Sequence, residues 1–317
     1  MKKIIAFDYI RVISITGIIL CHFLYNYDCC RNLAGWLGNT FNTIFITMSA
    51  FLMGLKWEMA NRQALGITFL TNRIKKLSYT YYPYLLLMFL FIFFIERDIP
   101  SVKEILLHFG FFPIFQRIPN WSHLWFVSMI TLCYTGIYVY TQMVRIKISP
   151  AIIALTGVIG LAIVEKCNFS PILSNAIIYI CIYISIFTNT KPLFSFMEKQ
   201  NSRKKTFISL AFVTVCIILY HNIDKSNLHG LIIGVFSAIL LFIPMFNFFN
   251  SRKEYSLVSF ISGISFEIYL VHYIFTLSDY SIAKYIENPF WALLIIFAVC
   301  IISAYCLKRI SLERFFK

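Results

Sequence analysis

The segment DYIRVISITGIILCHF, residues 8 to 23, places an arginine and a histidine inside an otherwise apolar stretch. If the segment is helical, the step from Arg11 to His22 turns to within roughly 20° of the same face and rises about 16 Å. Ionisable side chains are costly inside a bilayer, and those that occur there commonly serve binding or catalysis. The segment therefore predicts a transmembrane helix with a cation near one end and an imidazole three turns deeper on the same face.

The composition of the whole chain is that of a polytopic membrane protein. Hydrophobic residues make up 59% of the 317 positions, charged residues 13%, and the mean hydropathy is +0.76. A soluble domain carries about 25% charged residues. We therefore expect an all-α integral membrane protein with about ten transmembrane helices, forming a single domain over residues 1–317. The expected spans are 8–27, 40–56, 77–95, 123–142, 149–165, 171–189, 206–221, 228–249, 255–278 and 289–307.

The distribution of positive charge predicts the orientation in the membrane. When both termini are placed in the cytoplasm, most Lys and Arg residues fall inside, above all in the 56–76 and 191–205 loops. Cytoplasmic loops of membrane proteins carry this excess, so we expect both termini to be cytoplasmic. The net charge of +14 has the same origin and does not indicate nucleic-acid binding.

The nine cysteines show no metal or redox spacing. Most lie in or beside apolar spans, where a thiol packs as a small hydrophobe. Cys29, Cys30 and Cys167 fall at the predicted outer rim and leave open a disulfide among them. We expect no metal site and no tightly bound cofactor.

The candidates for chemistry on the first helix are His22, Arg11 and Asp8. A neutral imidazole can accept a proton from an alcohol and return it to a leaving group, so His22 is the candidate general base. An intramembrane histidine also commonly serves packing, and this alternative stays open. Asp8 lies one turn before Arg11, close enough to pair with the guanidinium and orient it.

The span 255–278 carries a second pair of titratable residues. Glu267 is predicted near the middle of the bilayer, where a carboxylate needs a partner or a proton. It is a candidate catalytic partner of His22 or a structural hydrogen-bonding group between this helix and the first. His272 is predicted at a depth similar to that of His22 and is a candidate substrate contact.

Three further residues are candidates for binding. Arg73 and Lys76 are three positions apart at the predicted cytoplasmic end of a helix, a geometry suited to phosphates, although cytoplasmic anchoring explains such residues as well. Trp125, in HLWFVS, suits the face of a sugar or the aromatic belt of the membrane. His108, His221 and His229 look like loop or rim residues without a role.

These residues belong to short motifs that occur in a characteristic order. The first is D-x-x-R, a ten-residue spacer and H, formed by Asp8, Arg11 and His22. The later motifs are Ser49-Ala50-Phe51-Leu52, the basic segment with Arg73, Lys76, Pro83 and Tyr84, the triplet Leu124-Trp125-Phe126, and SFEIYLVH over residues 265–272. Over about residues 8 to 275 the chain resembles the membrane-bound acyltransferase-3 family, bacterial integral-membrane sugar O-acyltransferases.

The resemblance implies an activity, partners and a location. It implies an O-acetyltransferase of the bacterial cytoplasmic membrane whose donor is acyl-coenzyme A, usually acetyl-CoA, bound from the cytoplasm. The acceptor would be a hydroxyl of an extracytoplasmic carbohydrate or lipid-linked glycan. In this interpretation Arg11, Arg73 and Lys76 bind the donor, His22 and Glu267 act in catalysis, and Trp125 and His272 contact the acceptor. The resemblance is also compatible with a homo-oligomer.

Two other functions stay open. A secondary transporter or flippase for a polar or lipid-linked substrate would use the Arg, Glu and His residues as binding or relay groups. A glycan polymerase or a non-catalytic membrane subunit would not need Arg11 and His22 to be aligned.

Overall fold

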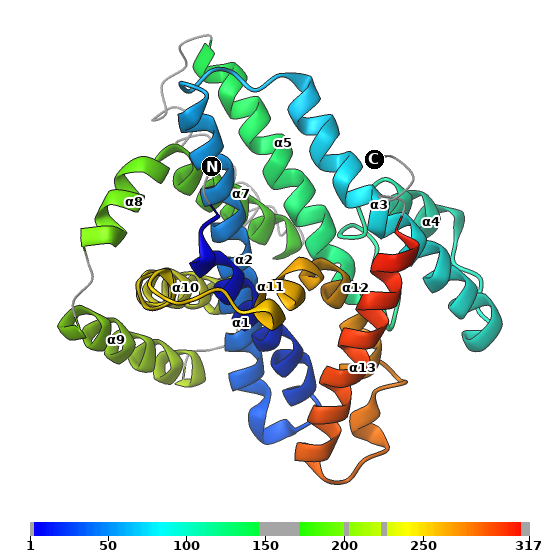
Figure 1. Ribbon diagram of the computed structural model, residues 1–317. Helices are drawn as coiled ribbons and strands as arrows, with labels where there is room; N and C mark the ends of the chain where they lie inside the picture. Colours follow the sequence, from blue (N-terminus) through cyan, green and yellow to red (C-terminus); the bar gives the residue numbers. More distant parts are fainter. Residues whose placement is uncertain (1–2, 146–170, 200–202, 223–226, 312–317) are drawn as a thin grey trace. The chain divides into compact units, whose positions relative to one another are not determined.

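The computed structural model describes residues 3–145, 171–199, 203–222 and 227–311. Within these ranges the chain forms helices and no strand, as the sequence predicts. The expected span 149–165 lies outside the described residues. Figure 1 shows the helices in chain order.

Twelve α-helices are described, and four short helical segments lie between them. The α-helices are α1 (Ile5–Leu24), α2 (Arg31–Met59), α3 (Ile67–Phe91), α4 (Val102–Phe109), α5 (Trp125–Arg145), α7 (Pro171–Thr188), α8 (Thr190–Lys199), α9 (Arg203–Asn222), α10 (Asn227–Asn250), α11 (Ser256–Gly263), α12 (Ser265–Thr276) and α13 (Pro289–Ile310). The short segments are η1 (Asp28–Cys30), η2 (Ile92–Glu96), η3 (Ser122–Leu124) and η4 (Ile282–Lys284).

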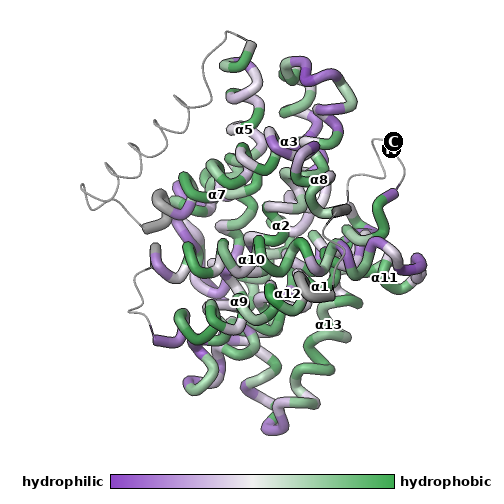
Figure 2. Tube along the Cα trace, turned by 90° about the vertical axis from the view of Figure 1, so that its left-hand side faces the viewer, coloured by the Kyte–Doolittle hydropathy of each residue, from purple (hydrophilic) through white to green (hydrophobic). Residues whose placement is uncertain are grey.

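Five of the described helices are long and apolar enough to cross a membrane. Their segments are Ile5–Leu24, Ile67–Glu96, Ser122–Val144, His229–Asn250 and Pro289–Ile310. The number rises to seven if two pairs of bent helices, α7 with α8 and α11 with α12, each form one span. Figure 2 shows the apolar character of α10 and α13 along most of their lengths. The protein is thus a helical membrane protein, whereas ten spans and cytoplasmic termini stay predictions.

Three expected helices differ clearly in their bounds. The span 77–95 begins ten residues earlier than expected, because α3 starts at Ile67. The span 40–56 is part of the longer α2, which falls outside the five because Asn and Thr residues recur along it. The expected span 255–278 is not one helix: α11 ends at Gly263, and α12 begins at Ser265. The prediction of a continuous helix was wrong because the apolar pattern continues through the break without a proline to mark it.

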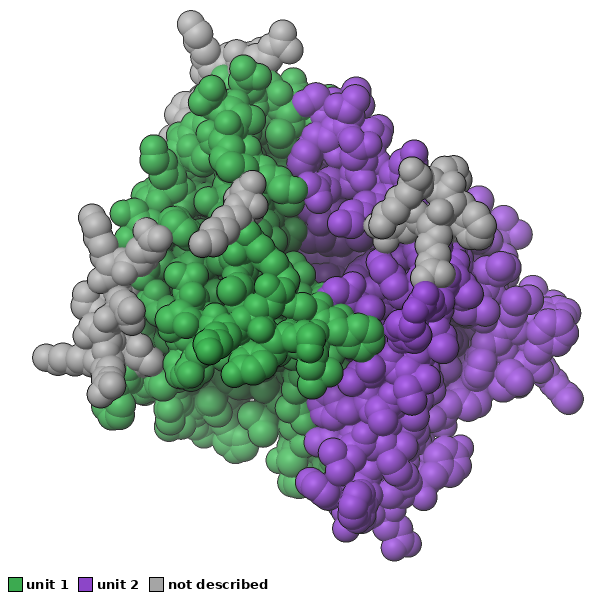
Figure 3. All heavy atoms as spheres, in the orientation of Figure 1, with its two compact units in different colours: residues 1–65, 136–262 green, residues 66–135, 263–317 purple. Residues whose placement is uncertain are grey.

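The chain divides into two compact units, coloured separately in Figure 3. Unit 1 comprises residues 1–65 and 136–262, and unit 2 comprises residues 66–135 and 263–317. Each unit therefore combines an early and a late part of the sequence. The candidate residues fall into both units.

Unit 1 is built around α1, α2 and α10, which pack against one another. Their contact is filled by phenylalanines; the Phe7 ring lies 5.6 Å from that of Phe51 and 5.7 Å from that of Phe246. Small residues permit close approach of these helices, as is common in membrane proteins. At Gly234 of α10, an added Cβ atom would lie 2.5 Å from the Cβ atom of Asn39 in α2.

In unit 2, α3, α12 and α13 pack together, and the segment after α4 folds back onto α3. Tyr81 of α3 stacks on Phe111 with ring centroids 5.2 Å apart. Tyr84 meets Trp121 edge to face at 6.0 Å. This aromatic packing fixes the start of η3 and α5, where several candidate residues lie.

Candidate functional site

The predicted arginine–histidine face lies on one unbroken helix, α1, in unit 1. The adjoining face of α1, with Phe7, Ile10 and Ser14, is buried. Arg11 and His22 are each half-buried. Because the helix has no break between them, the two residues share a face, with a separation along the axis of about 16 Å.

Near the start of α1, Ser262 bridges Asp8 and Arg11. Arg11 Nη1 donates a hydrogen bond to Ser262 Oγ at 2.9 Å, and Ser262 Oγ donates to Asp8 Oδ1 at 2.7 Å. The direct ion pair between Arg11 Nη1 and Asp8 Oδ1 is longer, at 3.8 Å. Asp8 and Arg11 thus lie close together, and a serine from α11 that the sequence analysis did not identify joins the two.

Lys3 completes a network at this end of unit 1. Its ammonium group pairs with Asp8 Oδ2 at 2.8 Å and with Glu254, and it donates to Ser259 Oγ at 3.1 Å. The hydrogen bonds that Lys3 donates to Asp8 and Glu254 raise the pKa of Lys3, and the bond to Glu254 lowers the pKa of that carboxyl group. Asp8 is thus closer to Lys3 than to Arg11, and Ser262 lies nearer to the guanidinium than Asp8 does.

His22 lies in the last turn of α1, next to a tyrosine-rich region of unit 1. Its ring centroid is 6.5 Å from that of Tyr25. A Cβ atom added at Gly35 of α2 would lie 3.2 Å from the hydroxyl of Tyr25 and 2.5 Å from that of Tyr220. Gly35 is therefore needed for both phenols to approach α2, and their packing fixes the position of Tyr25 beside His22.

Glu267 lies in unit 2 and is held by a cation and a hydroxyl. Lys308 Nζ of α13 lies 3.1 Å from Glu267 Oε1, and Thr80 Oγ1 of α3 donates to the same oxygen at 3.3 Å. Ser311 Oγ lies 3.2 Å from Thr80 Oγ1. The side chain of Glu267 is only 3% exposed, and these contacts offset the cost of burying its charge.

This environment changes the interpretation of Glu267. Glu267 occupies the first turn of α12, because the helix begins at Ser265, and a carboxylate is favourable at a helix N-terminus. Its described partners come from α3 and α13, so it links these helices structurally. Whether it also acts on His22 stays a prediction.

His272 of unit 2 is buried beside a second histidine, His123, which the sequence analysis did not single out. The two ring centroids are 5.3 Å apart, edge to face. His123 Nε2 donates to the carbonyl of Leu270 at 2.9 Å, and His272 Nδ1 donates to that of Tyr269 at 2.6 Å. A carbonyl only accepts hydrogen bonds, so these bonds require a proton on Nε2 of His123 and on Nδ1 of His272.

These contacts fasten η3 to α12. The hydroxyl of Tyr269 donates to the carbonyl of His123, and Ser122 Oγ donates to the hydroxyl of Tyr273 at 3.0 Å. The sequence did contain a sign of the importance of His123. It stands directly before Leu124 and Trp125 in HLWFVS, a segment that was selected for its tryptophan. The role of His272 as a substrate contact stays a prediction.

The remaining predicted binding residues also belong to unit 2. Arg73 and Lys76 lie on the uninterrupted helix α3, so their spacing of one turn is present. The Arg73 guanidinium lies over the Phe69 ring, 5.6 Å from its centroid, and Lys76 is exposed. Trp125 is half-buried at the start of α5 and packs edge to face with Phe126 at 5.9 Å.

The structure corrects the expectation that His108 is a loop or rim residue. It lies in α4 and is fully buried, and its Nδ1 atom lies 2.8 Å from the carbonyl of Glu104. Burial lowers the pKa of His108. His221 and His229 are exposed, as expected.

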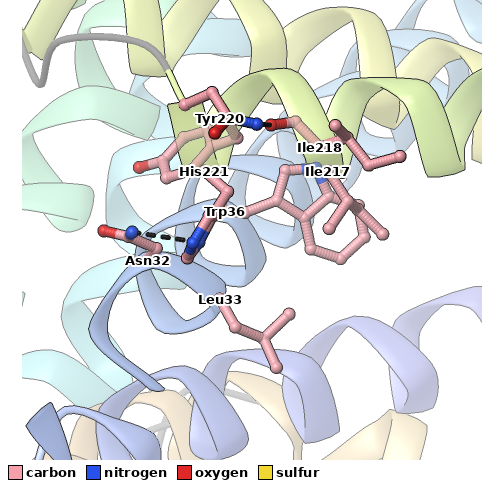
Figure 4. Close-up of a pocket in the computed structure, with 8 residues that line it drawn as sticks. Asn32, Leu33, Trp36, Ile217, Ile218, Tyr220 and His221 are labelled. Carbon is pink, nitrogen blue, oxygen red and sulfur yellow. Dashed lines mark hydrogen bonds between the residues drawn. The ribbon is translucent and has the colours of Figure 1, made fainter. Parts of the chain in front are cut away.

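A pocket of about 250 Å³ opens in unit 1 between the start of α2 and the end of α9 (Figure 4). Its walls are largely apolar, formed by Leu33, Trp36, Ile217 and Ile218. Polar groups of the pocket form hydrogen bonds to other side chains of the protein. Asn32 Nδ2 lies 3.1 Å from His221 Nδ1, and Trp36 Nε1 donates to Ser237 at 2.9 Å. None of the predicted site residues lines this pocket.

The cysteines and acidic residues offer no metal site among the described residues. Cys29 and Cys30 are free thiols with sulfur atoms 3.6 Å apart. Cys167 lies outside the described residues. A disulfide that includes Cys167 therefore stays untested.

The candidate residues are divided between the two units. Asp8, Arg11 and His22 belong to unit 1, together with Ser262. Arg73, Lys76, Trp125, Glu267 and His272 belong to unit 2. That His272 or Glu267 faces His22 therefore stays a prediction.

The apolar helices and the ionisable face of α1 define a helical membrane protein with a candidate site on its first helix. Residues 4–309, nearly the whole chain, match the acyltransferase-3 family, which is described as an acyltransferase domain. The chain belongs to this family, as its motifs indicated. Comparison with curated proteins and with solved structures finds no match.

Proposed function

We propose that this protein is a membrane O-acyltransferase. It would transfer an acyl group, acetyl in the simplest case, from cytoplasmic acyl-CoA to a hydroxyl of an extracytoplasmic or lipid-linked sugar. The observation that carries the proposal is the position of Arg11 and His22 on one face of the continuous helix α1, in a chain of the acyltransferase-3 family. The proposed location is the bacterial cytoplasmic membrane.

In the proposed reaction His22 is the general base. Its imidazole accepts the proton of the sugar hydroxyl while the oxygen attacks the thioester carbonyl carbon. The carbon–sulfur bond then breaks, and the imidazolium returns the proton to the sulfur of the departing CoA. Atoms and charge balance without a metal or a redox partner.

Arg11 is the proposed anchor for the donor. A guanidinium binds phosphate oxygens through charge-assisted hydrogen bonds, and the separation of about 16 Å along the helix would leave room for the donor's arm to reach His22. Arg73 and Lys76 are proposed as further phosphate contacts. Trp125 and His272 are proposed to contact the sugar, and Glu267 to assist His22.

The experiment that tests this function measures thiol release from acetyl-CoA by purified protein in proteoliposomes. Positioned bases contribute about 10² to 10⁴ in rate, so His22→Gln should lower turnover by that factor while donor binding persists in a thermal-shift titration. His229→Gln is the matched control, because His229 is exposed on α10 of the same unit. Near wild-type turnover in a well-inserted His22→Gln protein would refute the mechanism.

A second experiment identifies the acceptor. Mass spectrometry of surface glycans from cells with and without the protein should show a loss of acetyl groups. Acetylation that is unchanged in all glycans would contradict a sugar acceptor.

A transporter or flippase is the second candidate, and one observation favours it. Interrupted helices are typical of transporter binding sites, and α11 and α12 are separated by such a break. A transporter would move substrate without cleaving acetyl-CoA. Thiol release therefore distinguishes the two functions.

A further inference from the structure

Ser262 belongs to none of the sequence motifs, but its contacts join two of the candidate residues. Ser262 is buried, in the last turn of α11. Its hydroxyl lies between the cation and the carboxylate at the start of α1, at 2.9 Å from Arg11 Nη1 and 2.7 Å from Asp8 Oδ1. All three residues belong to unit 1.

The chemistry of the three groups fixes the direction of both hydrogen bonds. A guanidinium has only donors, and a carboxylate has only acceptors. Ser262 must therefore accept from Arg11 through a lone pair and donate its one proton to Asp8. Alanine lacks both functions, whereas threonine keeps them.

The shortest connection between Asp8 and Arg11 runs through this hydroxyl. The direct contact between Asp8 and Arg11 is 3.8 Å, and Asp8 has a nearer cation, Lys3, at 2.8 Å. The carboxylate polarises the Ser262 hydroxyl, which strengthens the bond that the oxygen accepts from the guanidinium. The side chain of Arg11 is thus held from α11 as well as from its own helix.

We propose that Ser262 is a positioning residue that sets the affinity for the acyl donor by fixing the guanidinium of Arg11. This inference rests on the proposed function, in which Arg11 binds donor phosphate. A flexible arginine loses side-chain entropy when it binds, and Ser262 reduces this cost by holding the side chain before the donor arrives. The effect belongs to donor binding and not to the chemical step.

The test compares two donors, acetyl-CoA and acetyl-pantetheine, of which the second lacks the phosphates. Ser262→Ala should raise the KM for acetyl-CoA about tenfold to a hundredfold, the range expected for a hydrogen bond to a charged group. Its kcat at saturating donor should stay within about twofold of the wild type. With acetyl-pantetheine, KM should not change, and Ser262→Thr should restore most of the affinity for acetyl-CoA.

Ser259→Ala is the control. Ser259 lies one turn earlier in α11, and its hydroxyl binds Lys3 and Glu254. General loosening of this end of unit 1 would affect both serine variants and both donors.

The outcomes separate the inference from the function on which it rests. A wild-type protein that cleaves neither donor contradicts the proposed function itself. A wild-type protein that prefers acetyl-CoA, with the same preference in Ser262→Ala, overturns the role of Ser262 alone. An equal loss with both donors also overturns it, because it would indicate a structural effect.

Discussion

The ion pair between Glu267 and Lys308 gives the most direct prediction for unit 2. Replacing Lys308 with methionine keeps the length of the side chain and removes its charge. The 3.1 Å separation of the two charged atoms corresponds to a Coulomb attraction of about 5 kcal/mol at an effective dielectric constant of about 20. Removing one partner of a buried pair costs about 3–5 kcal/mol.

The exposure of the two side chains lowers that figure. Lys308 is 36% exposed, so water screens its charge in part. Thr80 and the N-terminus of α12 continue to stabilise the carboxylate in the variant. We therefore expect Lys308→Met to lower the free energy of unfolding by about 2 kcal/mol, which corresponds to a fall in Tm of about 4 °C.

The assay is thermal unfolding of purified variants in detergent, arranged as a double-mutant cycle. Glu267→Gln removes the charge that Lys308→Met leaves behind, so the double variant should be more stable than Lys308→Met alone. Lys284→Met is the matched control, because Lys284 pairs at 3.2 Å with Asp279, which is well exposed, and an exposed pair contributes about 0–1 kcal/mol.

Two results would refute this reasoning. One is an unchanged Tm in Lys308→Met, and the other is a double variant that is no more stable than Lys308→Met. The activity of Glu267→Gln is a separate measurement. A folded Glu267→Gln protein with full transfer activity would limit Glu267 to its structural role, and a folded, inactive one would support the proposed assistance to His22.

Three further predictions concern other parts of the molecule. Arg11→Ala should weaken acetyl-CoA binding about tenfold or more and Arg11→Lys should recover part of it; unchanged donor affinity in a thermal-shift titration would exclude the phosphate role. The pKa of His108 is lowered by burial, so its neutral form contributes stability above its ordinary pKa of about 6.5 that is lost as the pH falls below that value. The protection factors of the α4 amides, which are corrected for the pH dependence of intrinsic exchange, should therefore be lower at pH 5.5 than at pH 7.5. Equal protection factors at the two pH values in a His108→Phe variant would attribute the change to this imidazole, and a pH effect that persists there would contradict it. Gly54→Ala would place a Cβ atom 1.9 Å from Thr190 Oγ1 and 2.6 Å from the carbonyl oxygen of Phe187, so we expect a loss of about 1–3 kcal/mol, and an unchanged Tm would show that α2 can shift.

Much of the helical architecture followed from local properties of the sequence. The length and apolarity of the first span determine α1, and helical periodicity then places Arg11 and His22 on one face. The motifs identified the acyltransferase-3 family from the spacing of a few residues, and the family match confirms it. The break between α11 and α12 was missed because hydropathy alone does not register it.

The partners of the ionisable residues depended on the tertiary structure. Glu267 and Lys308 are distant in sequence, as are Asp8 and Ser262, and His123 and His272. Helical periodicity relates residues within one helix, but it does not determine which face of another helix packs against them. By itself the sequence determined that charges are buried in a membrane protein of this family and that Arg11 and His22 share a face. Only the packing of the helices within each unit decided that Ser262 holds Arg11 and that Lys308 neutralises Glu267.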